Sequence, residues 1–198
     1  DPASAKLLNP NVTGTSGAAP INENLKLMRK IFPKAKNIGI IYNSSEQNSV
    51  SEVNNLKKLA KENGFNVVDK AITNGTELLA AANIISKEID IYYATQDNTV
   101  ASYFAALLDV LNKVKVPVFA TNDVYSNAGA FISQGTTDYG IGYRSGEIAA
   151  EILLKGKKPS DFPIEAVKNL QIKVSKSNME FLGLKLPKDV ESQVIFTK

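Results

Sequence analysis

The sequence predicts an α/β fold, a doubly wound parallel sheet with helices on both of its faces. From residue 37 onward, short apolar runs rich in β-branched residues alternate with longer amphipathic segments. The apolar runs are continuous rather than alternating, which is typical of strands buried on both faces. With 198 residues, of which 43% are hydrophobic, the chain is long enough for one good-sized domain or two small lobes.

The expected elements follow one another as strand and helix. Residues 21–33 predict a helix that Pro33 stops. NIGIIY at 37–42 predicts a strand, and the following amphipathic segment predicts a helix closed by Asn63 and Gly64. Further strands are expected at residues 65–72, 89–95, 116–122 and 129–134, and further helices at 76–88 and 99–113, with a short helical turn between the last two strands.

The last third of the chain gives a weaker pattern. It predicts an amphipathic helix that ends at Gly156, a strand at residues 170–175 and a short helix within KSNMEFLGL. The residues before 22 are rich in turn formers. No internal repeat or low-complexity tract interrupts this order.

Composition excludes several classes of protein. Cysteine and histidine are both absent, so the chain has no disulfide framework, no cysteine nucleophile, no histidine base and no Cys/His metal site. The net charge is +3 and the lysines are spread along the chain, which indicates a solvated surface and no nucleic-acid partner. No P-loop or GxGxxG motif follows a strand, and we expect no cofactor.

The sequence carries no membrane-spanning signal. No stretch approaches the roughly 20 apolar residues that cross a bilayer, and no signal peptide precedes Asp1. Because the chain begins without Met, we expect a processed or trimmed product whose targeting information has been removed.

Polar clusters follow three consecutive strands. The carboxyl ends of parallel strands are where open α/β sheets bind ligands. Ser44 and Gln47 have the spacing of a capping box, so one interpretation of the first cluster is a helix cap alone. The other interpretation is a site for a small polar ligand. The three clusters are Ser45, Glu46, Asn48 and Ser49; Gln96, Asp97, Asn98 and Thr99; and Thr121, Asn122 and Asp123.

An enzyme is a weaker interpretation of the same residues. Paired carboxylates for acid/base chemistry are available from Glu46, Asp97 and Asp123. No nucleophile, metal-ligand set or histidine accompanies them, so the pattern favours binding over catalysis. We therefore predict that the chain is not an enzyme.

An ordered set of motifs resembles the substrate-binding proteins of ABC transporters in the TrpX-like family, which have the type I periplasmic-binding-protein fold. The resemblance runs nearly end to end. The motifs that carry it are NPNVTGTSG (9–17), IGIIYNSSEQNSV (38–50), ATQDNTVAS (94–102), PVFATND (117–123), the segment from GAFISQ to DFPIE (129–165) and SKSNMEFLGLKLP (175–187).

The resemblance implies two Rossmann-like lobes joined by a hinge that close over a ligand. A complete member of the family has most of its first lobe before the Asp1-Pro2 with which this chain opens. We therefore expect residues 1–32 to be the end of the first lobe and a crossover, 33–132 an intact second lobe, and 133–198 a crossover, a first-lobe helix and C-terminal elements. Such a chain is expected to expose apolar surface or to pair with a second copy.

The resemblance also implies roles for individual residues toward an amino-acid ligand. Asp97 is assigned to the ligand's ammonium group, with Asn98 and Asp123 near it, and Glu46 lies in the same region and can face either group. Donors for the ligand's carboxylate are expected from Ser45, Asn48, Ser49 and Thr99 of this lobe and from Thr15 and Ser16 of the other.

The function that the resemblance implies is the extracytoplasmic solute-binding component of an ABC importer. Its expected partners are an amino acid, commonly aromatic such as tryptophan, and a permease. It would meet the membrane through a lipid anchor absent from this chain, as a cell-surface lipoprotein or in the periplasm. The alternative is the effector-binding domain of a transcription regulator of the same fold, which a helix-turn-helix before residue 1 would favour and a lipoprotein signal would exclude.

Overall fold

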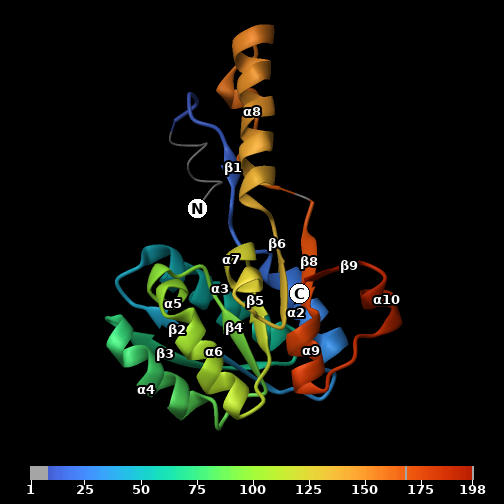
Figure 1. Cartoon of the computed structure of the whole chain (residues 1–198). Helices are drawn as coiled ribbons and strands as arrows, with labels where there is room; N and C mark the ends of the chain where they lie inside the picture. Colours follow the sequence, from blue (N-terminus) through green and yellow to red (C-terminus); the bar gives the residue numbers. More distant parts are fainter. Residues whose placement is uncertain (1–8, 168, 198) are drawn as a thin grey trace. The chain divides into compact units, whose positions relative to one another are not determined.

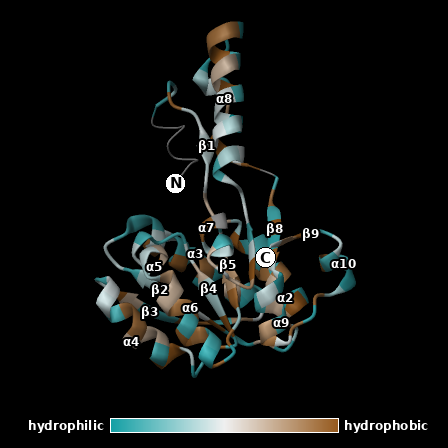
Figure 2. Ribbon diagram, viewed as in Figure 1, coloured by the Kyte–Doolittle hydropathy of each residue, from teal (hydrophilic) through white to brown (hydrophobic). Residues whose placement is uncertain are grey.

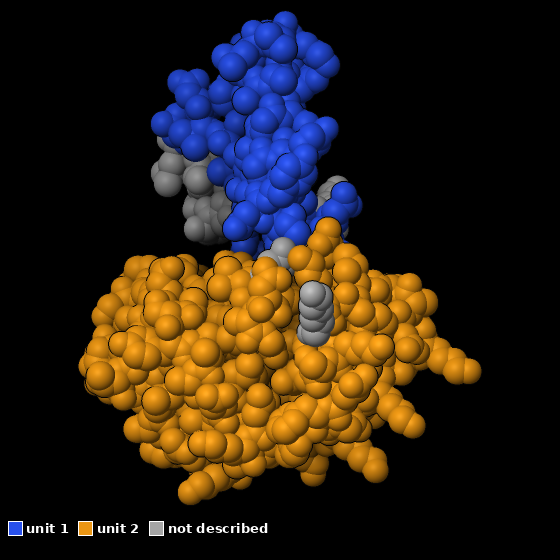
Figure 3. All heavy atoms as spheres, in the orientation of Figure 1, with its two compact units in different colours: residues 1–18, 136–170 blue, residues 19–135, 171–198 orange. Residues whose placement is uncertain are grey.

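The computed structural model describes residues 9–167 and 169–197, apart from the side chain of Asp123. The chain divides into two compact units (Figure 3): a larger one of residues 19–135 and 171–198, and a smaller one of residues 1–18 and 136–170. The expected second lobe, 33–132, lies inside the larger unit. Its limits as a lobe of a complete binding protein stay a prediction.

A seven-stranded sheet forms the centre of the larger unit (Figure 1). In the order in which they lie side by side, the strands are β3 (Asn66–Ile72), β2 (Asn37–Asn43), β4 (Ile91–Ala94), β5 (Val118–Ala120), β6 (Ile132–Gly135), β8 (Gln171–Ser175) and β9 (Val194–Thr197). The first five are parallel, β8 runs antiparallel to β6, and β9 is parallel to β8. The predicted α/β class with a mostly parallel sheet is confirmed.

Helices cover both faces of this sheet. The side chains of β2 alternate between two apolar cores, one on each face, and each core needs helices to cover it. Ile38 and Ile40 belong to one apolar core and Ile41 belongs to the other, because successive side chains of a strand point to opposite faces. The first core is packed by α2 and α3, and the second by α4, α5 and α6. The helices of this unit are α2 (Ile21–Ile31), α3 (Gln47–Glu62), α4 (Gly75–Ile85), α5 (Asn98–Ser102), α6 (Phe104–Lys113), α7 (Asp123–Asn127), α9 (Lys176–Leu182) and α10 (Lys188–Glu191).

Large side chains buried on both faces keep the central strands in place. Tyr92 and Tyr93 of β4 are both completely buried and belong to opposite cores. Tyr93 is stacked on Phe119 of β5, with ring centroids 6.4 Å apart and an angle of 2° between the ring planes. Fully burying a large apolar side chain contributes about 1.5–3 kcal/mol, so this pair helps to hold β4 and β5 together.

Two parts of the fold differ from the sequence-based expectation. The predicted helix 99–113 is wrong as one element, because Tyr103 leaves the helical conformation (φ −110°, ψ 13°) and separates α5 from α6. The strand expected at 170–175 exists as β8, but the additional strand β9 beside it was not predicted.

The smaller unit is built around one long helix. α8 (Asp138–Lys155) ends where Gly156 adopts the left-handed conformation (φ 64°), as the sequence predicts. A two-stranded parallel pair, β1 (Thr15–Ser16) with β7 (Glu165–Ala166), and the short 3₁₀ helix η1 (Pro159–Asp161) complete the unit.

Much of the apolar surface of α8 is exposed. Ile148 is buried, whereas Leu153 and Leu154 near the end of the helix are 80% and 82% exposed, and the stacked pair Tyr139 and Tyr143 is also exposed. The last turn of the α8 ribbon has the brown colour of hydrophobic residues (Figure 2). The expected exposure of apolar surface is thus found on this helix. None of the helices in the described part of the chain is both long and apolar enough to cross a membrane.

The end of β6 gives the first testable prediction. A Cβ atom at Gly135 would overlap the backbone carbonyl oxygen of Thr121, which only a backbone shift can relieve. We expect Gly135→Ala to lower the free energy of unfolding in urea by about 1–3 kcal/mol. Gly142→Ala in α8 is the matched control, because its Cβ meets no atom within 4 Å. The control should be neutral or stabilise the chain by up to about 1 kcal/mol, and equal stability of the two variants would contradict the prediction.

Candidate functional site

The candidate site lies in the larger unit, at the carboxyl ends of the neighbouring strands β2 and β4. β2 leads into α3 through residues 44–46, and β4 leads into α5 through residues 95–97. Because the two strands are adjacent and parallel, these connections emerge at the same edge of the sheet. We call this edge, residues 43–49 together with 95–99, the polar edge.

Asp97 joins the two halves of the polar edge. Its Oδ2 accepts a hydrogen bond from the backbone N–H of Asn43 at 2.7 Å, and its Oδ1 accepts one from Val100 N–H at 2.9 Å. The residue is 2% exposed and is the N-cap of α5. Hydrogen bonds from backbone N–H groups to a buried carboxylate are charge-assisted and strong, so Asp97 fixes the end of β2 to the start of α5.

Glu46 makes a second connection between the halves. Its two carboxylate oxygens accept four hydrogen bonds of 2.8–3.2 Å, from the backbone N–H groups and side chains of Asn98 and Thr99. Partial burial would raise the pKa of Glu46, but these four hydrogen bonds favour the charged form and hold the pKa below its usual value. Glu46 is therefore a carboxylate occupied by protein donors.

The backbone of Gln96 is held by side chains from α3 in both of its peptide groups. Its carbonyl oxygen accepts hydrogen bonds from Asn48 Nδ2 at 2.5 Å and Ser49 Oγ at 3.4 Å. Its N–H donates to Glu52 Oε2 at 3.2 Å. The three side chains lie on one face of α3, since residues four apart are neighbours on a helix. Sequence reasoning missed Glu52, although its i, i+4 spacing from Asn48 is the signal that would have found it.

The surroundings of Glu52 are poorly matched to a negative charge. Its Oε1 is buried, and within the described residues it has no hydrogen-bond partner of regular geometry. Desolvation raises the pKa of Glu52, the charge of Asp97 raises it further, and the Gln96 N–H and the nearby hydroxyls of Thr95 and Tyr93 offset this only in part.

The third strand end contributes a tyrosine that the sequence did not indicate. The Tyr125 hydroxyl of α7 donates to the carbonyl oxygen of Thr95 at 2.7 Å and lies 3.2 Å from that of Asp97. Asn122 is the N-cap of α7, and its Oδ1 accepts the N–H of Val124 at 3.1 Å. Asp123 begins α7, but its side chain lies outside the described residues.

Most of the predicted site residues of the larger unit therefore meet at the polar edge. The side chains of Glu46, Asn48, Ser49, Asp97, Asn98 and Thr99 bind one another or the backbone of the same edge. Ser45 is exposed beside them, and its backbone N–H donates to Asn43 Oδ1 at 2.9 Å. Their roles toward a ligand stay predictions.

Thr15 and Ser16 lie in the smaller unit and are bonded within it. Thr15 Oγ1 donates to the carbonyl oxygen of Ile141 at 3.2 Å and lies 2.5 Å from Ser145 Oγ. Ser16 Oγ accepts the N–H of Ala18 at 3.2 Å. Their contribution to a ligand site stays a prediction.

The capping-box interpretation of the first cluster is wrong. The N-cap of α3 is Glu46, whose side chain makes no capping hydrogen bond. Ser44 Oγ instead donates to the carbonyl oxygen of Ile72 at 3.3 Å, at the end of the neighbouring strand β3. The side chains that follow β2 thus bind across to neighbouring strand ends rather than to their own helix.

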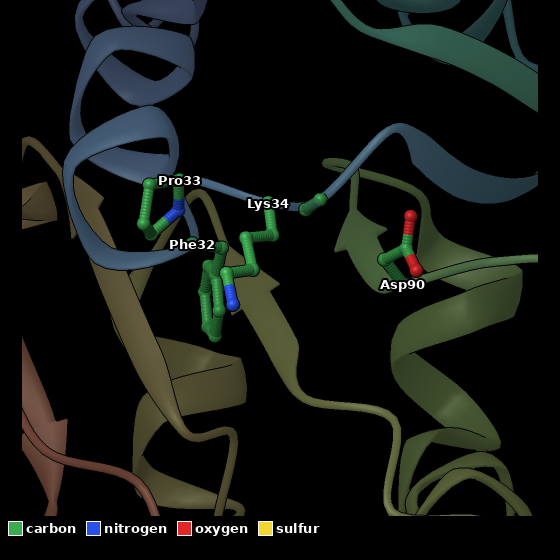
Figure 4. Close-up of a pocket in the computed structure, with 5 residues that line it drawn as sticks. Phe32, Pro33, Lys34 and Asp90 are labelled. Atoms are coloured by element: carbon green, nitrogen blue, oxygen red, sulfur yellow. The ribbon is translucent and has the colours of Figure 1, made fainter.

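A surface hollow of about 320 Å³ lies elsewhere on the larger unit (Figure 4). It is lined by residues 32–35 and Asp90, which precede β2 and β4. Asp90 Oδ2 is occupied by the backbone N–H groups of Lys36 and Asn37, at 2.7 and 2.9 Å. The hollow is therefore at the amino ends of the strands, opposite the polar edge.

Comparison with known proteins finds matches along nearly the whole chain. The family model described as ABC transporter substrate binding protein matches residues 1–195. A tyrosine-binding protein of Clostridioides difficile (strain R20291) is 34% identical over 174 residues, which are 88% of this chain and 50% of that protein. The chain spans about half the length of the curated relatives that it matches.

Solved structures agree with these matches. The crystal structure of a conserved domain protein from Vibrio cholerae is 33% identical, with a TM-score of 0.85, and the match covers 100% of this chain and 69% of that one. The structure of an ABC domain in complex with L-Trp from Streptococcus pneumonia is 26% identical, with a TM-score of 0.82, and the match covers 99% and 70% of the two chains.

The geometry of Asp97 predicts a structural cost for its removal. Asp97→Ala leaves two backbone N–H groups without their acceptor and removes the N-cap of α5. We expect the free energy of unfolding in urea to fall by about 2–4 kcal/mol. Asp109→Ala, at an exposed position of α6, is the control and should change it by less than about 0.5 kcal/mol. A similar loss of unfolding free energy in both variants would show that Asp97 does not fix the end of β2 to the start of α5.

The raised pKa of Glu52 predicts a pH-dependent stability. A carboxyl group whose pKa is higher in the folded than in the unfolded chain, where it is near 4.5, contributes stability below that value. This contribution is lost as pH rises through the folded pKa. Glu52→Gln cannot ionise, so its free energy of unfolding should exceed that of the wild type by more at about pH 8 than at about pH 4. A difference that does not change with pH would contradict the assignment.

Proposed function

Because the chain belongs to the ABC transporter substrate-binding protein family, we propose that it binds an aromatic L-amino acid and supplies it to the permease of an ABC importer. The family is one of substrate-binding proteins and not of enzymes, so the prediction that the chain is not an enzyme is confirmed. The resemblance to substrate-binding proteins of ABC transporters, drawn from the sequence, is confirmed as well.

One observation carries the choice of ligand. The curated relative that is 34% identical to this chain is named for binding tyrosine, and a solved relative holds L-Trp. Both ligands combine an ammonium group, a carboxylate and an aromatic ring. Tyrosine and tryptophan are therefore the first ligands to test.

The polar edge is suited to the charged end of such a ligand. Ser45 and Asn98 are exposed and carry donors and acceptors, so we assign them to direct contact. Ser49 and Asp97 are buried and already bonded to protein groups, and we assign them to holding the edge in shape. Thr15 and Ser16 are proposed to complete the site from the smaller unit.

The proposed place of action is outside the cytoplasm. An importer needs its binding protein on the side from which the solute comes, where an amino acid is captured and passed to the permease. A lipid anchor or a periplasmic location would keep the protein near that permease. Both the location and the permease partner are part of the proposal.

The test exploits the absence of tryptophan from the 198 residues. L-tryptophan fluorescence can be followed without protein indole, so protein is titrated into it and the anisotropy is recorded. We expect a saturable rise that L-tyrosine and L-phenylalanine reverse and ribose does not. The complete gene product is tested in parallel by calorimetry with the same ligands.

Matched variants connect the result to the polar edge. Ser45→Ala and Asn98→Ala should each weaken binding by about 10- to 100-fold, the cost of one lost hydrogen bond to a charged group. Ser51→Ala, at an exposed position of α3 outside the polar edge, is the control and should bind as the wild type does. Reversal by ribose, or no binding of any amino acid by either form of the protein, would refute the proposed function.

A further inference from the structure

The backbone of Gln96 is the point at which α3 holds the connection between β4 and α5. Its carbonyl oxygen, in the peptide group that joins it to Asp97, is bonded by Asn48 and Ser49. Its N–H, in the peptide group that joins it to Thr95, is bonded by Glu52. Two consecutive peptide groups are thus held by a single helix, and neither can rotate without breaking a hydrogen bond from α3.

The position of the Gln96 backbone decides where the next three residues lie. Asp97, Asn98 and Thr99 follow Gln96 directly and supply half of the polar edge. The Gln96 N–H donates to Glu52. Without the Glu52 acceptor, only the peptide group that follows Gln96 would be bonded to α3.

We propose that Glu52 is a positioning residue of the ligand site: by accepting the Gln96 N–H, its carboxyl group keeps Asp97, Asn98 and Thr99 in the arrangement that binds the ligand. This inference rests on the proposed function for its consequence in affinity. It concerns a residue that makes no ligand contact of its own and acts through the Gln96 peptide.

The surroundings of Glu52 indicate that the acceptor atom matters and the negative charge does not. Tyr93 of β4, Tyr125 of α7 and Asp97 are the titratable groups that face it, and each is neutral or negative, so none pairs with a carboxylate. Buried Asn24 Oδ1 is also without a hydrogen-bond partner among the described residues. A neutral side chain with one acceptor fits this place at least as well as a carboxylate.

Two substitutions at Glu52 distinguish the effect of the hydrogen-bond acceptor from the effect of the negative charge. Glu52→Gln keeps an oxygen that can accept the Gln96 N–H, whereas Glu52→Leu has a similar length and no acceptor. Glu62→Leu, at the exposed end of the same helix, is the matched control. All three are measured beside the wild type for L-tyrosine and L-tryptophan affinity and for hydrogen exchange at the Gln96 amide, with circular dichroism to check folding.

The expected results differ between the variants. Glu52→Leu should bind at least about 10-fold more weakly and exchange the Gln96 amide at least about 10-fold faster. Glu52→Gln should stay within about threefold of the wild type in both measurements, as should Glu62→Leu.

Each opposite result has a defined meaning. Slow Gln96 exchange in Glu52→Leu would overturn the positioning role, and a Glu52→Gln variant as impaired as Glu52→Leu would overturn the role of the acceptor. If neither this chain nor the complete gene product binds any amino acid, the proposed function fails, while the exchange rates still decide whether Glu52 holds the Gln96 backbone. Failure of the inference and failure of the proposed function are therefore distinguished.

Discussion

The buried carboxylate of Asp97 is the constraint on which the polar edge depends. It accepts one hydrogen bond from the end of β2 and one from the first turn of α5. A carboxylate that is 2% exposed is stable only when such donors are in place, so the ends of β2 and β4 and the start of α5 can form only together. Tyr125 adds the third strand end to this arrangement through the Thr95 carbonyl.

Around Asp97, the side chains of the edge use most of their hydrogen-bonding capacity on one another. Glu46 is bonded to Asn98 and Thr99, while Asn48 and Ser49 are bonded to the Gln96 carbonyl. Such an edge is ordered before a ligand arrives, and a preordered site loses less conformational entropy when it binds. In the proposed function, exposed residues contact the ligand and buried, bonded residues hold the edge in shape, although both kinds have the same polar character in the sequence.

The sequence predicted the elements whose signal is local and missed the features that depend on distant partners. Continuous apolar runs placed β2 and β3 to within one residue, and Pro33 and Gly156 marked helix ends because their backbone geometry is restricted. The strand β9 consists of the β-branched and aromatic residues VIFT, but the run is only four residues long and its pairing with β8 is set by the fold. The polar clusters located the edge, but which oxygen meets which N–H is a property of the β2 and β4 pairing, so Glu52 and Tyr125 were missed.

The polar groups of the edge also limit how well it can distinguish one amino acid from another. Hydroxyl, amide and carboxylate groups recognise the ammonium and carboxylate that all amino acids share. The exposed members of the edge are all polar and add no apolar wall: Ser44, Ser45, Gln47, Asn48 and Asn98. Discrimination between side chains requires apolar contacts that fill or exclude a particular shape. If the proposed function is correct, affinity for the amino-acid end is built into the larger unit, and preference for an aromatic ring must come from residues outside the polar edge.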